Sequence, residues 1–200
     1  MWVIGIVGGV ASGKSFVAGY FRNLGAEIVD VDEVGHQVLR DPDVIAAVAR
    51  RWGPEVIGKD GYIDRRAVAR IVFSPPPEGP RQLIHLEQIT HPPIAERLER
   101  QIAQARAQSG ARAVVLDAAV LIKAGWHRLC DKIVFVDAPR ELRLERSRQR
   151  GWTDDEFAAR EAAQPPLTVQ REAADVVMDN STSPEWIQAE VKRFWTSLSK

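Results

Sequence analysis

Cysteine is nearly absent from this sequence, and other familiar features are missing with it. The single thiol of Cys130 excludes an intramolecular disulfide and any metal cluster built on several cysteines. We expect Cys130 to be a small apolar residue beside a strand rather than a catalytic group. No uninterrupted apolar run approaches the roughly 20 residues that a membrane-spanning helix needs. The N-terminus runs directly into a strand-like segment, without the pattern of a signal peptide.

An excess of charge of either sign is also missing. Lysine plus arginine number 27, and aspartate plus glutamate number 27. A neutral chain gains little from counterion release on a nucleic acid or from an anionic membrane surface, so an anionic ligand must be held by local geometry. We expect a cytoplasmic protein, a monomer or weak homo-oligomer, that binds a small molecule and has no nucleic-acid or membrane partner.

Five short apolar runs predict buried strands in a chain of 200 residues, which is about one domain. These runs are Trp2–Val7, Glu27–Val31, Ala113–Leu116, Lys132–Val136 and Asp175–Met178. Helical patterns lie between them, which predicts a three-layer α/β fold with a five-stranded parallel sheet covered on both faces. Four of the runs end at aspartates, which are candidates for chemistry at the sheet's carboxyl edge or for helix caps: Asp30 and Asp32, Asp117, Asp137, and Asp179.

A long helical stretch separates the second and third of these runs. Residues 41–110 contain more helix than one crossover connection requires, and we interpret them as an inserted subdomain that binds the acceptor. Asp41-Pro42 and Asp64 are expected to begin helices there. His91-Pro92-Pro93 is expected to break a helix before a longer one starts at Ile94.

Residues 139–166 are rich in arginine, and we interpret them as a lid. Thr153-Asp154-Asp155-Glu156 predicts a capping box for the second helix of this unit. The nucleotide-binding core then consists of residues 1–40, 111–138 and 167–200, and its last helix is expected to start at Ser183-Pro184.

The clearest motif lies directly after the first predicted strand. Residues 8–15 match G-x-x-x-x-G-K-[ST] completely, and a helix is expected from Ser15 to Leu24. Backbone N–H groups of such a loop surround phosphate at a helix N-terminus. Lys14 is expected to reach the β- and γ-phosphates of ATP, and Ser15 to bind Mg²⁺. We assign the nucleotide to Gly8, Gly9, Val10, Ala11, Ser12, Gly13, Lys14, Ser15 and Phe16.

Several classes of P-loop protein do not fit the rest of the sequence. The fourth predicted strand leads into Val136-Asp137-Ala138-Pro139, which lacks the guanine-reading motif of a GTPase, and the chain is short for a transporter ATPase. A small-molecule kinase fits better, because it uses arginines to stabilise the transferring phosphoryl group and to exclude water. We choose Arg146, Arg150 and Arg160 for this role; a solvated helix face is the alternative.

Two of the aspartates are assigned specific roles. Asp32 is interpreted as the carboxylate that accepts or orients the proton of the acceptor hydroxyl. This assumes that the second strand neighbours the P-loop strand and that Asp30 and Asp32 face the same way along it; the alternative is that Asp32 caps a helix. Asp117 either holds Mg²⁺ or caps a helix.

These residues together resemble the dephospho-CoA kinase family, over nearly the whole chain. The matching segments are Gly5–Ser15, Asp30-Val31-Asp32, Asp64-Arg65-Arg66-Ala67, His91-Pro92, Arg146 and Arg150, Gln164, and Ala173–Asn180. The resemblance implies transfer of the ATP γ-phosphate to the ribose 3′-hydroxyl of dephospho-CoA, with Asp32 as catalytic base. It also implies that Asn180 lies at the nucleotide and that the helical insert receives dephospho-CoA.

The sequence departs from the family pattern at two places. Phe16 stands where the family usually has threonine, and we expect little effect. Ala119 and Lys123 replace a proline and a glutamate after Asp117, which leaves open a kinase for another nucleotide or metabolite. A non-catalytic ATP-binding switch protein is the other alternative.

Acceptor contacts are predicted with their alternatives. Arg65 is assigned to the acceptor's phosphates or is a solvated residue in the first turn of a helix, and His91 contacts a phosphate or anchors a helix break. Asp117 and Arg160 are also assigned to the acceptor side. Tryptophans at positions 52, 126 and 152 stack on adenine or belong to the core and its rim.

Overall fold

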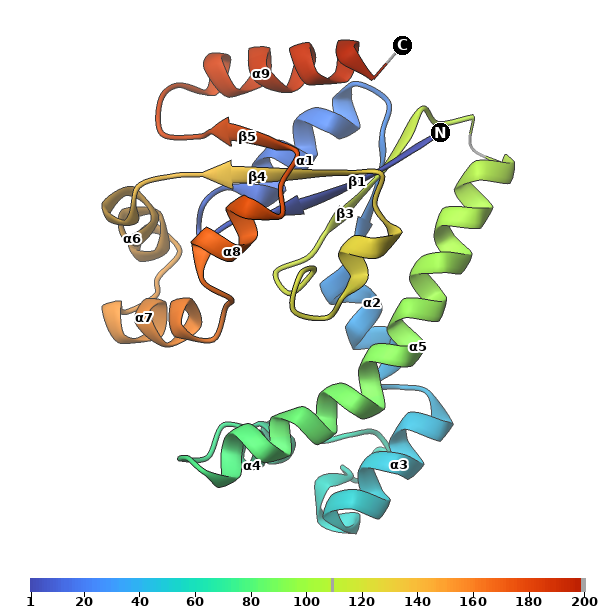
Figure 1. The fold of residues 1–200 in the computed structure, drawn as a ribbon. Coiled ribbons are helices and arrows are strands. Elements are labelled where there is room, and N and C mark those ends of the chain that lie inside the picture. The colour runs from blue at the N-terminus through green and yellow to red at the C-terminus, as the bar shows by residue number, and fades with distance from the viewer. Residues whose placement is uncertain (109, 199–200) are drawn as a thin grey trace. The chain divides into compact units, whose positions relative to one another are not determined.

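A computed structural model describes residues 1–108 and 110–198 (Figure 1). Its centre is a five-stranded sheet in which every neighbouring pair of strands is parallel. The chain divides into two compact units, one formed by Met1–Asp30 with Gln101–Lys200 and the other by Val31–Arg100. The second unit therefore starts before residue 41 and ends before residue 110, the two bounds of the predicted insert.

The five predicted strands are confirmed, with ends that differ by one residue at most. They are β1 (Trp2–Val7), β2 (Glu27–Asp30), β3 (Ala113–Asp117), β4 (Lys132–Asp137) and β5 (Val176–Asp179). Four consecutive residues of β3, Ala113 to Leu116, have no exposed surface. Burial on both faces explains why the central strands read as continuous apolar runs.

The strand order corrects one prediction. It runs β2-β3-β1-β4-β5, so β3 separates β2 from the P-loop strand β1. β2 exposes both Glu27 and Asp30, as an edge strand can, whereas β3, which is apolar and buried from Ala113 to Leu116, has a neighbour on each side. In this register Asp117 pairs with Ile6 on one side and with Asp30 on the other.

Two helices cover one face of the sheet and confirm their predictions. α1 (Lys14–Asn23) and α9 (Pro184–Ser197) bury Phe21 and Trp195 in one cluster with Ile4 and Ile6 of β1. Ser183 begins α9 as expected, because its side chain accepts a hydrogen bond from the N–H of Trp186. The sheet and this cluster form a rigid base for the loop between β1 and α1.

Three helices follow β4 in the first unit. They are α6 (Arg140–Gln149), α7 (Asp154–Ala162) and α8 (Leu167–Glu172). Figure 1 shows α6 and α7 beyond the arrow ends of the strands and α8 beside the strands. The predicted capping box of α7 is present, with Thr153 and Glu156 bonded to each other's backbone N–H. Gly151 has φ of 81° in the turn between α6 and α7, a conformation that favours glycine.

The second unit is helical, as predicted. It contains α2 (Val31–Val38), α3 (Pro42–Trp52), the 3₁₀ helix η1 (Pro54–Val56), α4 (Arg65–Val72) and the larger part of α5 (Glu78–Gln108). Asp64 caps α4, since its carboxylate accepts hydrogen bonds from the N–H groups of Arg66 and Ala67. α3 starts at Pro42 as expected, but Asp41 makes no side-chain cap and instead accepts a hydrogen bond from Arg97.

The predicted helix break at His91-Pro92-Pro93 is wrong. α5 continues through both prolines, and Figure 1 shows a helix that bends without ending. After the prolines, Ile94, Leu98, Ile102 and Ala105 keep one buried stripe at helical spacing. Packing of that stripe offsets the backbone hydrogen bonds that two prolines remove. Within the described residues, no helix combines the length and apolarity that crossing a membrane requires.

Candidate active site

The loop between β1 and α1 has the backbone of an anion cradle. Gly8, Ala11 and Gly13 have φ values of 146°, 58° and 97°. A Cβ on Gly13 would lie 2.1 Å from Nδ2 of Asn180, so only glycine fits there. Alternation of these conformations with ordinary ones is the backbone pattern of loops whose N–H groups surround an anion. In this structure the N–H of Gly8 donates to Gln170 and that of Ser12 to the carbonyl of Gly9. The start of α1 at Lys14 adds the positive end of a helix dipole.

Two polar side chains of this loop are placed to meet phosphate. The Lys14 ammonium donates hydrogen bonds to the carbonyls of Gly8 (2.9 Å) and Gly9 (3.0 Å), which holds it across the loop. Ser12 is 1% exposed, and its hydroxyl is one of two buried side-chain polar atoms in the described part of the chain without a hydrogen-bond partner. A buried hydroxyl without a partner is rare in folded proteins, and a bound ion is one of the explanations for it.

Ser15 and Asp117 come together at the carboxyl edge of the sheet. The Ser15 hydroxyl donates to Oδ2 of Asp117 at 2.8 Å. Burial raises the pKa of the Asp117 carboxyl, although the Ser15 hydrogen bond and the charge of Lys14 lower it, and Asp30 raises it further. The helix-cap alternative for Asp117 is wrong, because residues 118–125 form turns and no α-helix follows β3 directly.

Asp32 lies in a helix and not in a strand. β2 ends at Asp30, and α2 begins at Val31, so Asp32 belongs to the first turn of α2. The expectation that Asp30 and Asp32 face the same way along one strand is therefore wrong. A carboxylate in the first turn is favoured by the helix dipole. Asp32 lies in the second compact unit, two residues after the end of β2.

The arginines of the predicted lid differ in their surroundings. Arg146 donates to the carbonyls of Ser12 (3.2 Å) and Asn180 (2.8 Å), and Asn180 donates to Ser12 as well (2.8 Å). Burial and the neighbouring charge of Arg150 lower the pKa of Arg146. A cavity of about 260 Å³ opens beside these groups and is lined by Gly13, Phe16, Arg146, Arg150, Asn180, Thr182 and Pro184.

Other predicted residues do not line this cavity. The exposed Arg160 places its guanidinium 4.2 Å from the ring centroid of Trp152. Trp126 is buried, and Trp52 donates to Gln82, so these rings read as core or rim residues. Burial, followed by the charge of Asp131, raises the pKa of the Cys130 thiol to about 12, which keeps it protonated and unreactive.

Two buried residues that hold the phosphate loop were missed in the sequence. Gln170 of α8 is 2% exposed, and its Oε1 accepts a hydrogen bond from the N–H of Gly8 at 3.0 Å. Arg143 of α6 is also 3% exposed and donates to the carbonyl of Val10 at 3.3 Å. Arg143 is buried on a helix that also carries exposed arginines, and nothing in the residue pattern distinguishes it from them.

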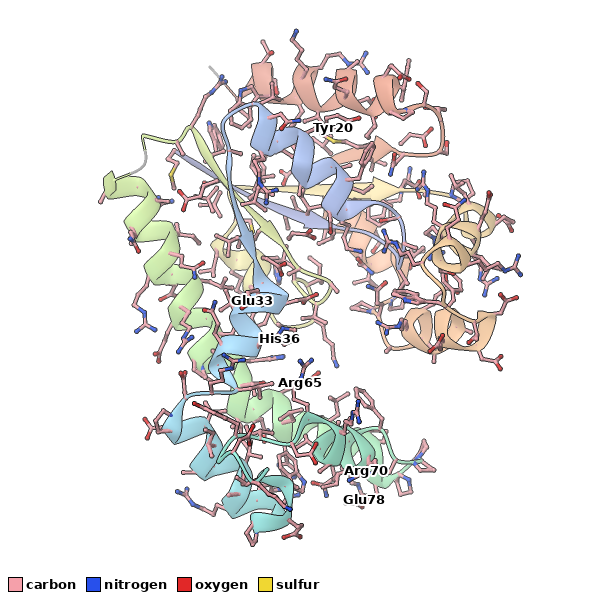
Figure 2. The ribbon with its side chains drawn as sticks, turned by 180° about the vertical axis from the view of Figure 1, so that it is seen from behind. Tyr20, Glu33, His36, Arg65, Arg70 and Glu78 are labelled. Carbon is pink, nitrogen blue, oxygen red and sulfur yellow. The ribbon has the colours of Figure 1, made fainter. Side chains whose placement is uncertain are left out.

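The second unit contains its own polar cavity. It measures about 480 Å³ and is lined by Glu33, His36, Gln37, Leu39, Arg40, Asp60, Tyr62, Ile63 and Arg65. Arg65 and Nε2 of His36 lie 2.9 Å apart, and Figure 2 shows their side chains side by side with Glu33 nearby on α2. His91 lies within α5, so its interpretation as the anchor of a helix break is wrong.

Comparison with known proteins gives one consistent family. A family model described as dephospho-CoA kinase matches residues 2–185. A dephospho-CoA kinase of Syntrophotalea carbinolica is 38% identical over 193 residues, which cover 96% of this chain and 89% of that protein. The crystal structure of TT1252 from Thermus thermophilus is similar with 32% identity and a TM-score of 0.82, covering 100% of this chain and 98% of that one. Dephospho-CoA kinase from Campylobacter jejuni has a TM-score of 0.72 at 21% identity, covering 98% and 96% of the two chains, and supports the fold alone.

Proposed function

The chain belongs to the dephospho-CoA kinase family, and from this premise we propose how it transfers the γ-phosphate of ATP to the ribose 3′-hydroxyl of dephospho-CoA. The observation that carries the proposal is the loop formed by residues 8–15, with positive φ at Gly8, Ala11 and Gly13 and with Lys14 held across it. In this proposal the loop binds the β- and γ-phosphates of ATP, and Lys14 leaves the two carbonyls to stabilise the transferring group.

Ser15 and Asp117 are the proposed side-chain contacts of Mg²⁺. A Mg²⁺ ion in a kinase takes one or two protein oxygens and completes its shell with phosphate oxygens and water. A hydroxyl and a carboxylate 2.8 Å apart fit that donor set, and the described residues contain no cluster of three or more His, Cys, Asp or Glu for a metal. When bound, the ion supplies positive charge to the phosphate oxygens.

Asp32 is the proposed catalytic base. The support for this role is the position of Asp32 in the Asp30-Val31-Asp32 motif, which starts at the last residue of β2. The strand next to β2 in the sheet, β3, carries Asp117. The Asp32 carboxylate accepts or orients the proton of the 3′-hydroxyl as the phosphoryl group is transferred. Arg146 and Arg150 are proposed to face the donor phosphates, and Phe16 and Asn180 to border the rest of the nucleotide. Arg160 remains a predicted acceptor-side contact.

Acceptor binding is proposed for the second unit. Arg65 and His36 supply cationic and hydrogen-bonding groups to the cavity there, which suits the phosphates of dephospho-CoA. His91 stays a predicted acceptor contact. The cytoplasmic location and the monomeric or weakly oligomeric state also stay predictions.

The test is an assay of purified protein with Mg·ATP against dephospho-CoA, nucleoside monophosphates and shikimate. We expect phosphorylated product only with dephospho-CoA. Product formed only from another acceptor would assign the chain to the rival metabolite kinases, and ATP binding without any product would make it a switch protein.

Asp32→Asn tests the base separately from binding. We expect the variant to keep nucleotide affinity within about threefold and to lose about 100- to 1,000-fold in kcat, because it lacks a proton acceptor. Asp43→Asn, also an acid in the first turn of a helix, is the matched control and should leave kcat unchanged. Turnover that is indifferent to Asp32→Asn would remove this residue from the chemistry.

A further inference from the structure

A buried guanidinium links the phosphate loop to the helices that follow β4. Arg143 of α6 is 3% exposed and donates in three directions. Its Nε lies 3.2 Å from the carbonyl of Ala138, Nη1 lies 3.3 Å from the carbonyl of Val10, and Nη2 lies 2.7 Å from Oε1 of Glu161. One rigid fork therefore contacts the end of the sheet, the phosphate loop and helix α7 together.

The surroundings of Arg143 are built to hold this fork. A Cβ on Gly9 would lie 2.8 Å from Nη1 and 3.0 Å from Cζ of Arg143, so the glycine makes room for the guanidinium. On another side, Cζ lies 5.6 Å from the ring centroid of the fully buried Phe157. Phe157 in turn shares a small apolar cluster with Val10 and Ala11 of the loop. The loop and α7 thus meet in one packed region around this charge.

The hydrogen bond to Val10 has a consequence for the loop's interior. A trans peptide is planar, so its C=O and its following N–H point in opposite directions. Holding the Val10 carbonyl toward Arg143 therefore turns the N–H of Ala11 away from Arg143. Among the residues that the structure describes, Ala11 is the one non-glycine residue with positive φ, at 58°. This conformation needs support from its surroundings. Arg143 supplies that support from outside the loop.

Stability alone is a weak reason for burying this charge. Replacing a buried ion pair with apolar side chains of similar volume is often neutral or stabilising, because both charges must lose water. Arg143 is instead suited to orientation, since a planar fork defines three directions at once. The same helix carries Arg146, three residues later, which contacts the loop carbonyl of Ser12.

We propose that Arg143 is a positioning residue for phosphoryl transfer. It fixes the Val10–Ala11 peptide so that the N–H of Ala11 faces the triphosphate, and it holds α6 in the position from which Arg146 reaches the same site. This inference rests on the proposed function for the reaction that it serves. Its effect on nucleotide binding does not depend on the identity of the acceptor.

Arg143→Met and Arg143→Lys test the proposal, with Arg140→Met as the matched control. Arg140 also bonds Glu161 (2.9 Å) and lies over Phe157 (5.3 Å), but its side chain is 53% exposed. ATP affinity is measured by calorimetry without acceptor, and kcat and both KM values are measured with dephospho-CoA. Thermal melts identify the temperature at which every variant is folded.

We expect Arg143→Met to weaken ATP binding about tenfold and to lower kcat about 30-fold, because small errors of position are costly in phosphoryl transfer. The KM for dephospho-CoA should stay within about twofold. Arg143→Lys keeps the charge and a single donor nitrogen but not the planar fork, and should recover part of both losses. Arg140→Met should match the unchanged protein within about twofold.

A variant with a lower melting temperature but unchanged kcat and ATP affinity would overturn the proposal, since Arg143 would then be a stability residue only. Equal losses in Arg140→Met would overturn it too, because the shared partners and not the loop contact would be responsible. If Arg143→Met does not fold, the same two readouts on Arg143→Lys decide the question. Wild-type protein that binds ATP but ignores dephospho-CoA would instead contradict the proposed function, and the calorimetric comparison of variants would still stand.

Discussion

Cationic side chains at the phosphate loop are already engaged with backbone oxygen atoms. Lys14 donates to Gly8 and Gly9, while Arg146 donates to Ser12 and Asn180. These carbonyls are neutral acceptors, although the charge of Lys14 also acts on Asp117. In the proposed function, exchange of a carbonyl for a phosphate oxygen strengthens each hydrogen bond, because charge-assisted bonds are the stronger kind. The proposal then has these residues in position before the nucleotide binds.

Phe16 lines the cavity beside the phosphate loop. The sequence led us to expect little effect of this departure from the family pattern. Its ring is 48% exposed, lies 4.9 Å from that of Tyr20, and lines the cavity shared with Arg150 and Pro184. An exposed aromatic ring beside a nucleotide-binding loop is suited to packing against a base or sugar.

Phe16→Ala should therefore weaken ATP binding about three- to tenfold, which corresponds to roughly 1 kcal/mol of lost stacking. Inorganic tripolyphosphate lacks a base, and its affinity should not change. Calorimetry with both ligands checks this, and Phe73→Ala, which truncates a 69% exposed ring in the second unit, is the control. Equal weakening of both ligands would mean that Phe16 acts on the loop and not on the base.

Much of the site was predictable at the level of residues because its signals are local. The phosphate motif fixes backbone conformations over eight neighbouring positions, and the expected strand, loop and helix are all present. Contacts between distant segments were not predictable in the same way. Gln170 and Arg143 reach the loop across 162 and 133 positions of sequence, and neither residue belongs to a local pattern.

At the scale of elements, hydrophobic periodicity and capping motifs predicted where helices and strands lie. The order of the strands along the chain did not predict their order in the sheet. Each strand was located to within a residue, since a run buried on both faces has no polar interruptions. The order of the strands was not, because adjacency in sequence is only a tendency and β3 inserts between β2 and β1. Two prolines also failed to end α5, because side-chain packing along the helix outweighs a local penalty.

The capping box of α7 gives a test of element stability. Thr153→Ala removes the acceptor for the N–H of Glu156, a bond of 3.2 Å, and leaves that donor without its cap. We expect a loss of about 1 kcal/mol in the free energy of unfolding, or about 2–4 °C in Tm. Thermal melts followed by circular dichroism measure it.

Thr196→Ala is the matched control for that substitution. The Thr196 hydroxyl donates to the carbonyl of Lys192 within α9, and this contact does not satisfy an unpaired helix end. Its Tm should change by less than about 1 °C, as is usual for an exposed site. Similar losses in both variants would show that the cap contributes no more than an ordinary surface threonine.

At the scale of the whole molecule, packing contacts divide the chain into its two units, and the division does not follow the positions of the loops. The sequence placed the insert at 41–110, because that helical stretch between the second and third strands exceeds what one crossover connection requires. The compact second unit instead runs from Val31 to Arg100, so it includes α2 and divides α5. One contact of α2 within this unit lies between Gly35 and Ile94, where a Cβ on Gly35 would be 3.7 Å from Cδ1 of Ile94. Such long-range packing is invisible to composition.

The acid response of the folded chain follows from carboxylates with lowered pKa values. Burial alone would raise the pKa of Asp175, but the N–H of Ile133 (2.8 Å) and the ammonium of Lys132 (2.9 Å) lower it below 3.8. Burial likewise opposes the hydrogen bonds from Arg140 and Arg143 that lower the pKa of Glu161 below 4.5. The unfolded chain therefore binds more protons than the folded chain as the pH falls. Stability from these groups is complete above their ordinary pKa values and is lost below them.

Asp175→Asn should flatten this acid response, because asparagine keeps a hydrogen-bond acceptor for Ile133 but cannot be protonated in this range. We expect the Tm of the unchanged protein to be nearly constant above about pH 5 and to fall steeply below about pH 4. The variant should start a few degrees lower and fall less steeply. Melts at several pH values measure both slopes, and Asp155→Asn, in the exposed first turn of α7, controls for the loss of one negative charge. Parallel curves for Asp175→Asn and the unchanged protein would mean that acid unfolding is governed by carboxylates other than the one that joins β4 to β5.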